Sequence, residues 1–324
     1  MNNDNGLVFG FVLDGRGGGK KVDFPDIHEW QPSDGTLWVH LDYTEQNAIE
    51  WLYAKSGIDD FIVESLVMQE TRPRSLLHKN GMLLILRGVN MNPGEDPEDM
   101  VAIRLWLDAD RIITMRHRRV MAIEDLRKAV ETGDGPKSTA DFLDELSDGL
   151  VTRMGTVISD IDDLVDALED EILTEQSHQL RQKVSDIRRT VIGMRRYLAP
   201  QRDVMARLYS EKAEWLDETT RMRLREISDR VTRYVEDLDA IRDRAIVTQE
   251  ELNHSLAEQM NKTMYVLSIV AALFLPLGFL TGLLGINIGG MPGVENSWAF
   301  TIFCIFLVVI ATLQVWLFRR KNWM

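Results

Sequence analysis

The sequence predicts an α+β membrane protein with an N-terminal α/β cytosolic domain, a long helical stalk and two C-terminal transmembrane helices. Short strand-like runs alternate with helical patterns near the N-terminus, apolar residues recur at every seventh position in the middle, and charges almost vanish after residue 262. These three patterns place the cytosolic domain at 1–137, the helical coiled-coil stalk at 138–262 and the two transmembrane helices at 263–324.

The charge is distributed very unevenly along the 324 residues. The whole chain has a net charge of −14, but residues 1–262 carry 50 Asp and Glu against 34 Lys and Arg, a balance of −16. An acidic body repels phosphates, so nucleic acid is not expected as a partner. The single cysteine, Cys304, excludes a disulfide framework and any multi-cysteine zinc or iron–sulfur site, and no cofactor is expected.

The cytosolic domain is expected to be α/β because strand-like and helical patterns are mixed in it. Helices are expected around Glu45–Lys55 and Val120–Glu131, and the sequence GDGPK at 133–137 marks the boundary of the domain. The last two strand-like runs are separated by two residues only, which predicts a hairpin. The expected strands are Leu7–Leu13, Leu37–Tyr43, Met82–Met91, Val101–Asp108 and Arg111–His117.

Two polar stretches of this domain resemble binding motifs. Asp14–Lys21 (DGRGGGKK) misses the G-x-x-x-x-G-K-[ST] phosphate-loop pattern at both ends, which favours a glycine-rich turn over a nucleotide site. Gln69–Arg74 (QETRPR) is expected to be a polar turn. Ion pairing within the domain is sufficient to explain its arginines, and an anion contact is the alternative.

The stalk is expected to begin with two helices of opposite charge. The first has two apolar rows with a spacing of seven, typical of a coiled coil. These rows are Leu150, Val157 and Leu164, and Met154, Ile161 and Leu168. Its other faces are acidic, whereas the second helix is basic and is expected to end at Pro200, so antiparallel pairing by charge is expected, with surplus carboxylates left to face water and cations.

A third helix is expected from Gln201, with a pause at Trp215–Asp217 where Asp217 can cap a new start. Its seam repeats at strict sevens through Leu224, Val231, Leu238, Ala245 and Leu252. No stop signal separates this seam from the first membrane span. A continuous helix from Asp217 to Leu284, about 100 Å long at 1.5 Å per residue, would therefore connect cytosol and membrane.

Two uncharged apolar runs, Met264–Leu284 and Trp298–Phe318, each have about the 20 residues that a helix needs to cross the hydrocarbon. The turn-rich segment Gly285–Ser297 joins them, so both termini lie on one side. Three basic residues follow the second span directly, and the positive-inside rule therefore places the N- and C-termini on the cytoplasmic side. The expected location is a bacterial inner membrane. No N-terminal signal peptide is expected.

Two spans per chain cannot enclose a polar pathway, so transport would require several chains around an axis. The first span is rich in small residues that permit close helix approach, which suits an axial position, and Pro276 predicts a bend near its middle. The second span is richer in bulky apolar residues and suits a lipid-facing outer ring.

The first span ends in the tripeptide Gly285-Ile286-Asn287. With two C-terminal spans, the long stalk helix and the stretches LDGRGG (13–18), TRPR (71–74) and MRRYLAPQRD (194–203), this tripeptide resembles the CorA superfamily of divalent-cation transporters over essentially the whole chain. The usual tripeptide there is Gly-Met-Asn. Isoleucine in place of the methionine, followed by IGGMPG at 288–293, is similar to the ZntB zinc-transport branch.

The resemblance implies a homopentameric funnel with an inner ring of first spans and an outer ring of second spans. Gly285, Ile286 and Asn287 would form the outer mouth of the pore, where five Asn287 carbonyl oxygens accept hydrogen bonds from water around a hydrated cation. Five copies of Glu295, the only charged residue of the loop, would form an anionic ring that attracts cations, and an ordinary surface role is the alternative.

Helical spacing back from Asn287 puts six residues on one stripe of the first span, and the resemblance favours a narrow apolar pore there over ordinary helix packing. The stripe consists of Met264, Leu267, Ala271, Leu275, Gly278 and Gly282, with the gate at Leu267 and Met264. On the stalk, Glu250, His254 and Glu258 share a helix face at a spacing that can place metal ligands, although solvated helix faces often show it.

The resemblance implies transport of zinc, with zinc as cargo rather than cofactor. It leaves both efflux and proton-coupled uptake open, and proton-coupled uptake is the leading interpretation. The expected partners are divalent cations, protons, the lipid bilayer and further copies of the chain. A magnesium, cobalt or nickel channel of the same superfamily and a membrane-anchored sensor that does not transport are the alternatives. An enzyme is not expected, because no Ser/His/Asp, paired-carboxylate or metal-hydrolase motif stands out.

Overall fold

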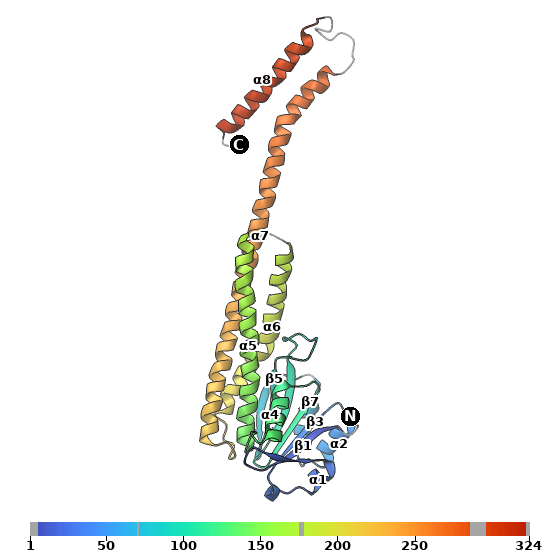
Figure 1. The fold of residues 1–324 in the computed structure, drawn as a ribbon, viewed down its shortest axis with the longest axis vertical. Coiled ribbons are helices and arrows are strands. Elements are labelled where there is room, and N and C mark those ends of the chain that lie inside the picture. Colours follow the sequence, from blue (N-terminus) through green and yellow to red (C-terminus); the bar gives the residue numbers. More distant parts are fainter. Residues whose placement is uncertain (1–5, 70, 175–177, 286–295, 322–324) are drawn as a thin grey trace. The chain divides into compact units, whose positions relative to one another are not determined.

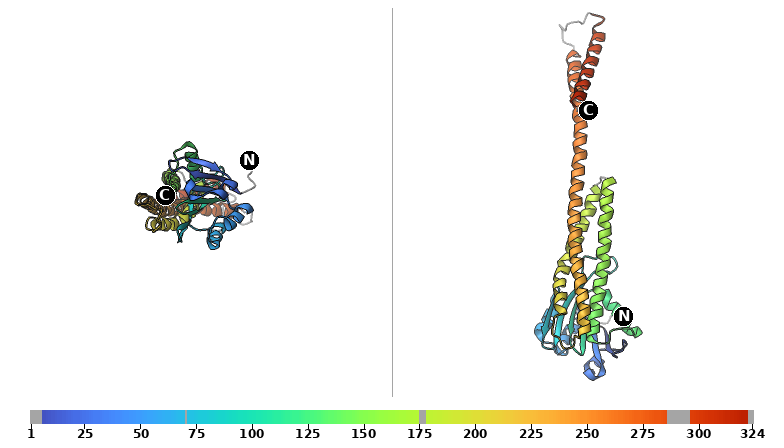
Figure 2. Two further views of the ribbon diagram at one scale, coloured as in Figure 1. Left: turned by 90° about the horizontal axis from the view of Figure 1, so that it is seen from below. Right: turned by 90° about the vertical axis from the view of Figure 1, so that its left-hand side faces the viewer.

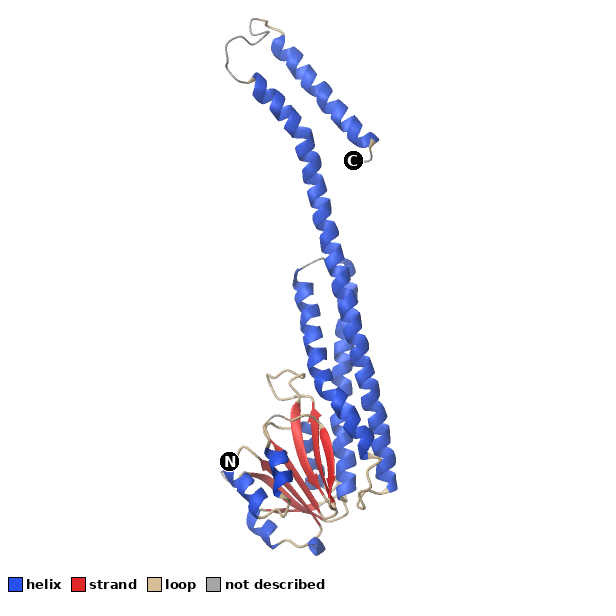
Figure 3. Cartoon of the chain, turned by 180° about the vertical axis from the view of Figure 1, so that it is seen from behind, coloured by secondary structure: helices blue, strands red, loops and turns tan. Residues whose placement is uncertain are grey.

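The computed structural model of the chain describes residues 6–69, 71–174, 178–285 and 296–321. It divides into two compact units, Met1–Gln249 and Glu250–Met324. The first unit contains a β-sheet with helices on both of its faces, and the second contains two apolar helices (Figures 1 and 3). The expected fold class, an α/β domain followed by long helices and two C-terminal apolar helices, is confirmed. The three-part division of the sequence stays a prediction.

Seven strands form one sheet in the described part of the first unit, in the order β2-β1-β3-β7-β6-β5-β4. Every neighbouring pair is antiparallel except β3 and β7, which are parallel. The strands are β1 (Leu7–Leu13), β2 (Gly19–Val22), β3 (Thr36–Asp42), β4 (Arg74–His78), β5 (Gly81–Gly88), β6 (Val101–Leu107) and β7 (Arg111–Arg116). The five expected strands are confirmed, and β6 and β7 form the expected hairpin.

Sequence reasoning missed β2 and β4, and both are edge strands of the sheet. Their side chains are mostly exposed or half-buried, so neither strand shows the alternation of apolar and polar residues that marks a half-buried strand. β4 lies partly within the stretch expected to be a polar turn, because the strand begins at Arg74, directly after Pro73.

Helices cover the two faces of the sheet with separate apolar cores. Strand β3 shows the division: Trp38 belongs to the core under the long helices, and Val39 belongs to the core on the opposite face. The opposite face carries α1 (Phe24–Glu29), α2 (Gln46–Ala54) and α3 (Asp60–Val67), and α4 (Met121–Thr132) packs on the face of the long helices (Figure 3). Helices α2 and α4 were expected, whereas α1 and α3 are short and were missed.

The glycine-rich stretch is a turn between β1 and β2. Asp14 Oδ1 accepts hydrogen bonds from the backbone N–H groups of Arg16 and Gly18, at 2.7 and 3.0 Å. Gly17 has φ +109°, and a Cβ there would lie 2.6 Å from the carbonyl oxygen of Gly133. A strand follows the turn, whereas a phosphate loop opens a helix, so the expected turn is confirmed.

Three long helices run side by side on one face of the sheet: α5 (Thr139–Thr174), α6 (His178–Leu208) and the first part of α7 (Glu218–Leu284) (Figures 1 and 2). On α5, the expected row of Met154, Ile161 and Leu168 is buried, but Leu164 of the other expected row is 55% exposed. The partner row consists instead of Ile158, Val165 and Ile172. The two choices have the same spacing, so only the position of the neighbouring helices decides between them.

The expectation that the second helix ends at Pro200 is wrong, because α6 continues through it to Leu208. A proline removes one backbone donor, but packing compensates here, since Leu198, Val204 and Leu208 are buried in the core. Gln201, fully buried, accepts a hydrogen bond from Arg87 N–H at 2.6 Å and donates one to the carbonyl of Arg87 at 3.1 Å.

Gln201 completes the sheet where an edge strand is too short. Strand β4 pairs with β5 only as far as Ile85, so the backbone groups of Arg87 on that side have no strand partner. A buried backbone donor or acceptor needs a partner, and the Gln201 amide supplies both. The glutamine therefore fixes α6 against β5.

The expected start of the third helix at Gln201 is wrong, because residues 201–208 belong to α6 and α7 begins at Glu218. The expected new start at Asp217 is confirmed, with Asp217 Oδ1 accepting a hydrogen bond from Thr220 N–H at 2.7 Å. The heptad row from Leu224 to Leu252 is at most 2% exposed, which confirms the predicted seam. Helix α7 then continues without a break to Leu284, as predicted.

The acidic faces of α5 pair mainly with α7 rather than with α6. Arg244 of α7 contacts three carboxylates of α5, from Asp162, Asp166 and Glu169. Two further arginines of α7 pair with α5 near the N-terminal ends of both helices: Arg223 with Asp144, and Arg230 with Asp148. Lys183–Glu171 is the α5–α6 ion pair among the described residues. The expected charge complementarity is therefore correct in kind, but its main partner is the third helix.

Candidate functional site

The apolar helices of the second unit are long and apolar enough to cross a membrane. They are the last part of α7 and α8 (Ala299–Arg320), and neither apolar window is buried within the chain, unlike the core helix of a soluble protein. Their hydroxyl groups donate within the helix: Ser268 to the carbonyl of Met264 at 2.8 Å, and Thr281 to that of Leu277 at 3.0 Å. Such bonds satisfy these two hydroxyl donors without water, which suits a hydrocarbon environment.

One side of the last part of α7 is half-buried, and so is one side of α8. The half-buried residues of α7 are Ile269, Leu273, Pro276, Leu277 and Leu280. Those of α8 include Phe303, Leu307, Ile310 and Ala311. Because these rows are the sheltered sides of two neighbouring helices within one unit, they mark the contact between the two spans (Figure 1).

The predicted pore stripe lies on the other side of α7. At about 100° per residue, its six members fall opposite the half-buried row. Met264, Leu267 and Leu275 are 61%, 68% and 72% exposed. A Cβ at Gly278 or Gly282 would meet nothing within 4 Å. Ala271, which lies between Leu267 and Leu275 on the stripe, is also exposed. The structure therefore brings the six stripe residues together on one apolar face that is uncovered within a single chain.

The predicted pore mouth is described only in part. Helix α7 ends at Leu284, and the Gly285 N–H donates to the carbonyl oxygens of Thr281 and Gly282 at 2.9 and 3.2 Å. Ile286, Asn287 and Glu295 lie outside the described residues. The roles of all four residues stay predictions.

The predicted metal face of the stalk, Glu250, His254 and Glu258, is exposed on α7. In the part of the chain that the structure describes, no three His, Cys, Asp or Glu side chains converge on a possible metal position. A metal site on this face would therefore need ligands from outside the described part of one chain, and the assignment stays a prediction.

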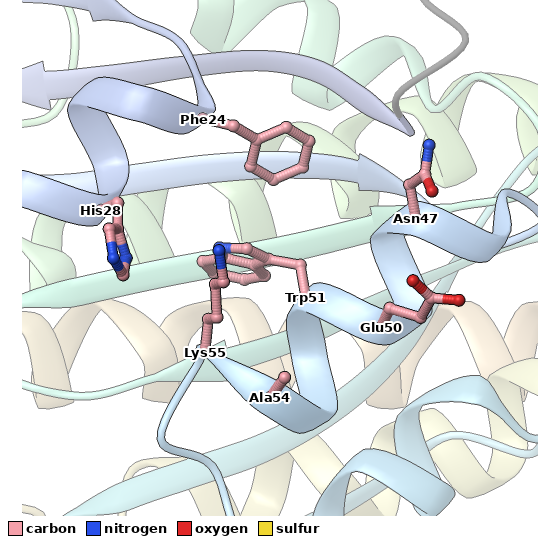
Figure 4. A pocket seen from close by; sticks show the side chains of 7 residues that line it. All are labelled: Phe24, His28, Asn47, Glu50, Trp51, Ala54 and Lys55. Carbon is pink, nitrogen blue, oxygen red and sulfur yellow. The ribbon is translucent and has the colours of Figure 1, made fainter.

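The first unit also has a hollow of about 350 Å³ between α1 and α2 (Figure 4). The rings of Phe24 and Trp51 lie across it with centroids 6.0 Å apart, and His28, Glu50 and Lys55 stand around them. Its charged groups are of mixed sign, so it has no clear preference for a cation or an anion.

Sequence reasoning missed two functional candidates, Arg87 and Arg104. Both are charged residues inside otherwise apolar strand runs, MLLILRG and VAIRLWL, and Arg104 is 1% exposed. A charge in a strand that is buried on both faces is costly, so it was a readable signal.

An α/β domain joined by one long helix to a pair of apolar spans defines the chain as a two-span membrane protein. Residues 33–320 match the sequence model of the family described as CorA-like Mg2+ transporter protein, and the chain belongs to this family. The expected CorA resemblance is thereby confirmed.

Individual relatives extend over the full chain. The divalent cation transporter CmaX of Pseudomonas aeruginosa is 41% identical over 329 residues, covering 99% of this chain and 98% of its own. The zinc transport protein ZntB of Yersinia enterocolitica is 36% identical over 317 residues, covering 98% of this chain and 96% of its own.

Two solved structures share the fold. The structure of full-length CmaX has a TM-score of 0.86 at 40% identity and covers 100% of both chains. The CorA magnesium transporter of Methanocaldococcus jannaschii has a TM-score of 0.79 at 19% identity, covering 98% of this chain and 99% of its own, a likeness of fold alone.

Proposed function

We propose that this chain transports divalent metal ions across the bacterial inner membrane, with zinc as the chief cargo taken up together with protons. It acts as a homopentamer whose first spans surround the ion pathway and whose Gly285-Ile286-Asn287 segments form the outer mouth. Both termini are cytoplasmic. Zinc is substrate and not a resident cofactor.

The observation that carries the proposal is the uncovered stripe of α7. Within one chain, α8 shelters one side of the first span and leaves the six stripe residues exposed on the opposite side. Two helices cannot enclose an aqueous path, so a pathway along this stripe needs further copies of the chain. An apolar lining with two exposed glycines suits a narrow pore that closes by excluding water.

The choice of zinc rests on the relatives and on the donor set. A 36%-identical relative is named a zinc transport protein. No cluster of cysteines, histidines or carboxylates is found in the described residues to hold zinc tightly, which favours passage of a hydrated ion over storage. The magnesium alternative is favoured by the family's description and by the broader name of the 41%-identical relative.

Radiotracer zinc uptake into proteoliposomes of known protein orientation tests the function. We expect saturable zinc uptake that an Asn287→Ala variant loses and that an inward proton gradient accelerates. Uptake that ignores the pH gradient would remove proton coupling, and magnesium uptake that zinc does not compete with would select the magnesium alternative. Absence of uptake of both zinc and magnesium would favour the alternative of a membrane-anchored sensor that does not transport.

The single cysteine gives a direct test of the stripe. In a Cys304→Ala background, Leu275→Cys places a thiol on the stripe and Leu273→Cys places one on the side facing α8. We expect a water-soluble thiol reagent to modify the first variant and to block its zinc uptake, while the second stays unmodified. Equal modification of both would contradict a pathway along the stripe.

A further inference from the structure

A cavity of about 170 Å³ lies at one edge of the sheet in the first unit. Strands β3 and β7 end there side by side, with Asp42 opposite Arg116, and β5 ends where β6 begins, with Gly88 opposite Val101. The charged and polar side chains around the cavity come from five separate segments: Tyr43, Gln69, Arg87, Asp99, Arg104, His117 and Arg118. No residue of the membrane spans is among its lining residues.

Arg104 is the most deeply buried charge at this cavity, at 1% exposed. Its Nη1 donates to the Leu66 carbonyl at 2.5 Å and its Nη2 to that of Gln69 at 3.3 Å. The guanidinium carbon lies 3.9 Å from the centre of the Tyr43 ring. A guanidinium has five N–H donors, so these two bonds leave spare donors.

Arg87 is held in the same way from the neighbouring strand. Its Nη1 and Nη2 donate to the carbonyls of Met100 and Thr71, both at 2.7 Å, and its guanidinium carbon lies 4.4 Å from the centre of the Tyr197 ring. Neutral carbonyls and ring faces fix the orientation of both guanidiniums but do not neutralise their charge.

One carboxylate, that of Asp99, lines the cavity and attracts Arg87 electrostatically without forming an ion pair with it. Glu95 and Asp99 both pair with Arg118 at the rim of the cavity. Among the described residues, neither Arg87 nor Arg104 has a carboxylate within ion-pair distance. Burial lowers the pKa of Arg104, and the positive charges of Arg87 and Arg74 lower it further. A buried and a half-buried guanidinium side by side, with no carboxylate at ion-pair distance, are costly unless an anion joins them.

We propose that this cavity binds a small tetrahedral oxyanion, inorganic phosphate or the phosphate group of a larger molecule, between the guanidiniums of Arg87 and Arg104. The planar guanidinium fork matches an oxyanion with two parallel N–H···O bonds, and the spare donors are available for them. The volume corresponds to about six waters at roughly 30 Å³ each, which suits a phosphate group but not a whole nucleoside.

The site is independent of the transport proposal, because it lies in the first unit and uses none of the stripe residues. Glu70 follows Gln69 directly and lies outside the described residues, so it is included in the test as the competing counter-ion.

Calorimetry of the full-length protein in detergent, titrated with inorganic phosphate, tests the proposal. We expect saturable binding of one phosphate per chain, an affinity at least tenfold lower for Arg87→Gln, and a change below twofold for Arg16→Gln. Arg16 is a matched control, an exposed arginine in the β1–β2 turn beyond the opposite end of the sheet. If Arg87→Gln does not fold, Arg118→Gln replaces it, since Arg118 is a rim residue and 41% exposed.

Every outcome bears on the site. Tighter phosphate binding by Glu70→Gln than by the unaltered chain supports the same cavity, because the substitution removes a carboxylate that is adjacent to Gln69 in the sequence. AMP that competes with phosphate would identify a phosphomonoester as the ligand, and AMP that does not compete would indicate the free ion. Absence of saturable phosphate binding to the unaltered chain overturns the proposal, as does an equal loss in the cavity and Arg16 variants.

Discussion

Replacing Gln201 by leucine should destabilise the first unit strongly, although leucine is apolar and fills much of the same space. The amide makes two hydrogen bonds to Arg87, one to its N–H at 2.6 Å and one to its carbonyl at 3.1 Å. Both backbone groups are left without partners in the Gln201→Leu variant. An unsatisfied buried group costs about 1–3 kcal/mol, so the expected loss is about 2–6 kcal/mol.

Gln182 provides a matched control on the same helix. It is exposed, and its side chain bonds only to Asp186 of the next turn, at 3.0 Å, among the bonds that the structure describes. Gln182→Leu therefore removes the same chemical group without orphaning a buried one, and it should change the stability by less than about 0.5 kcal/mol.

The comparison needs a thermal and a local measurement on the full-length protein. At roughly 2–4 °C per kcal/mol for a unit of this size, Gln201→Leu should lower the melting temperature by at least about 4 °C. Hydrogen exchange of a peptide covering β5 should accelerate in this variant and not in Gln182→Leu, because Arg87 lies in β5. Equal melting temperatures and equal β5 exchange in both variants would refute the reasoning.

Two further predictions concern charge. Burial holds the pKa of His40 at about 3, against 6.5 when unfolded, so its contribution to stability is complete well above pH 6.5 and is lost as the pH falls. We expect about 1.6 kcal/mol less unfolding free energy at pH 5 than at pH 6.5 from this residue. Denaturant unfolding at both pH values should show this drop in the unaltered chain and a smaller one in His40→Leu, and identical drops would contradict it. Arg244→Gln should cost about 1–2 kcal/mol, because three carboxylates of α5 lose their shared counter-ion. The difference from the unaltered chain should shrink in 1 M salt if its origin is electrostatic, and a cost that persists there would assign it to packing instead.

The sequence by itself determined the features that depend on local periodicity. A run of 21 residues without charge at Met264–Leu284 has few alternatives to a membrane span, and the seam from Leu224 to Leu252 follows from the period of a helix. The cap at Asp217 and the turn at Asp14–Gly18 were also readable, because a side chain satisfies nearby backbone groups in each. The pore stripe was readable as a helix face for the same reason.

Only the tertiary structure decided which elements meet. A spacing of seven is equally compatible with either partner row on α5, and the neighbouring helices bury Ile158 rather than Leu164. Proline at position 200 predicts a helix end locally, but core packing and the two bonds of Gln201 to Arg87 hold the helix together beyond it. The same holds for Arg87 and Arg104, whose meeting at the cavity depends on the register in which β5 pairs with β6. Local patterns determine the helices and strands because the spacing of apolar residues close together in the sequence gives the period of each element. Which elements pack against each other depends on contacts that no local pattern encodes.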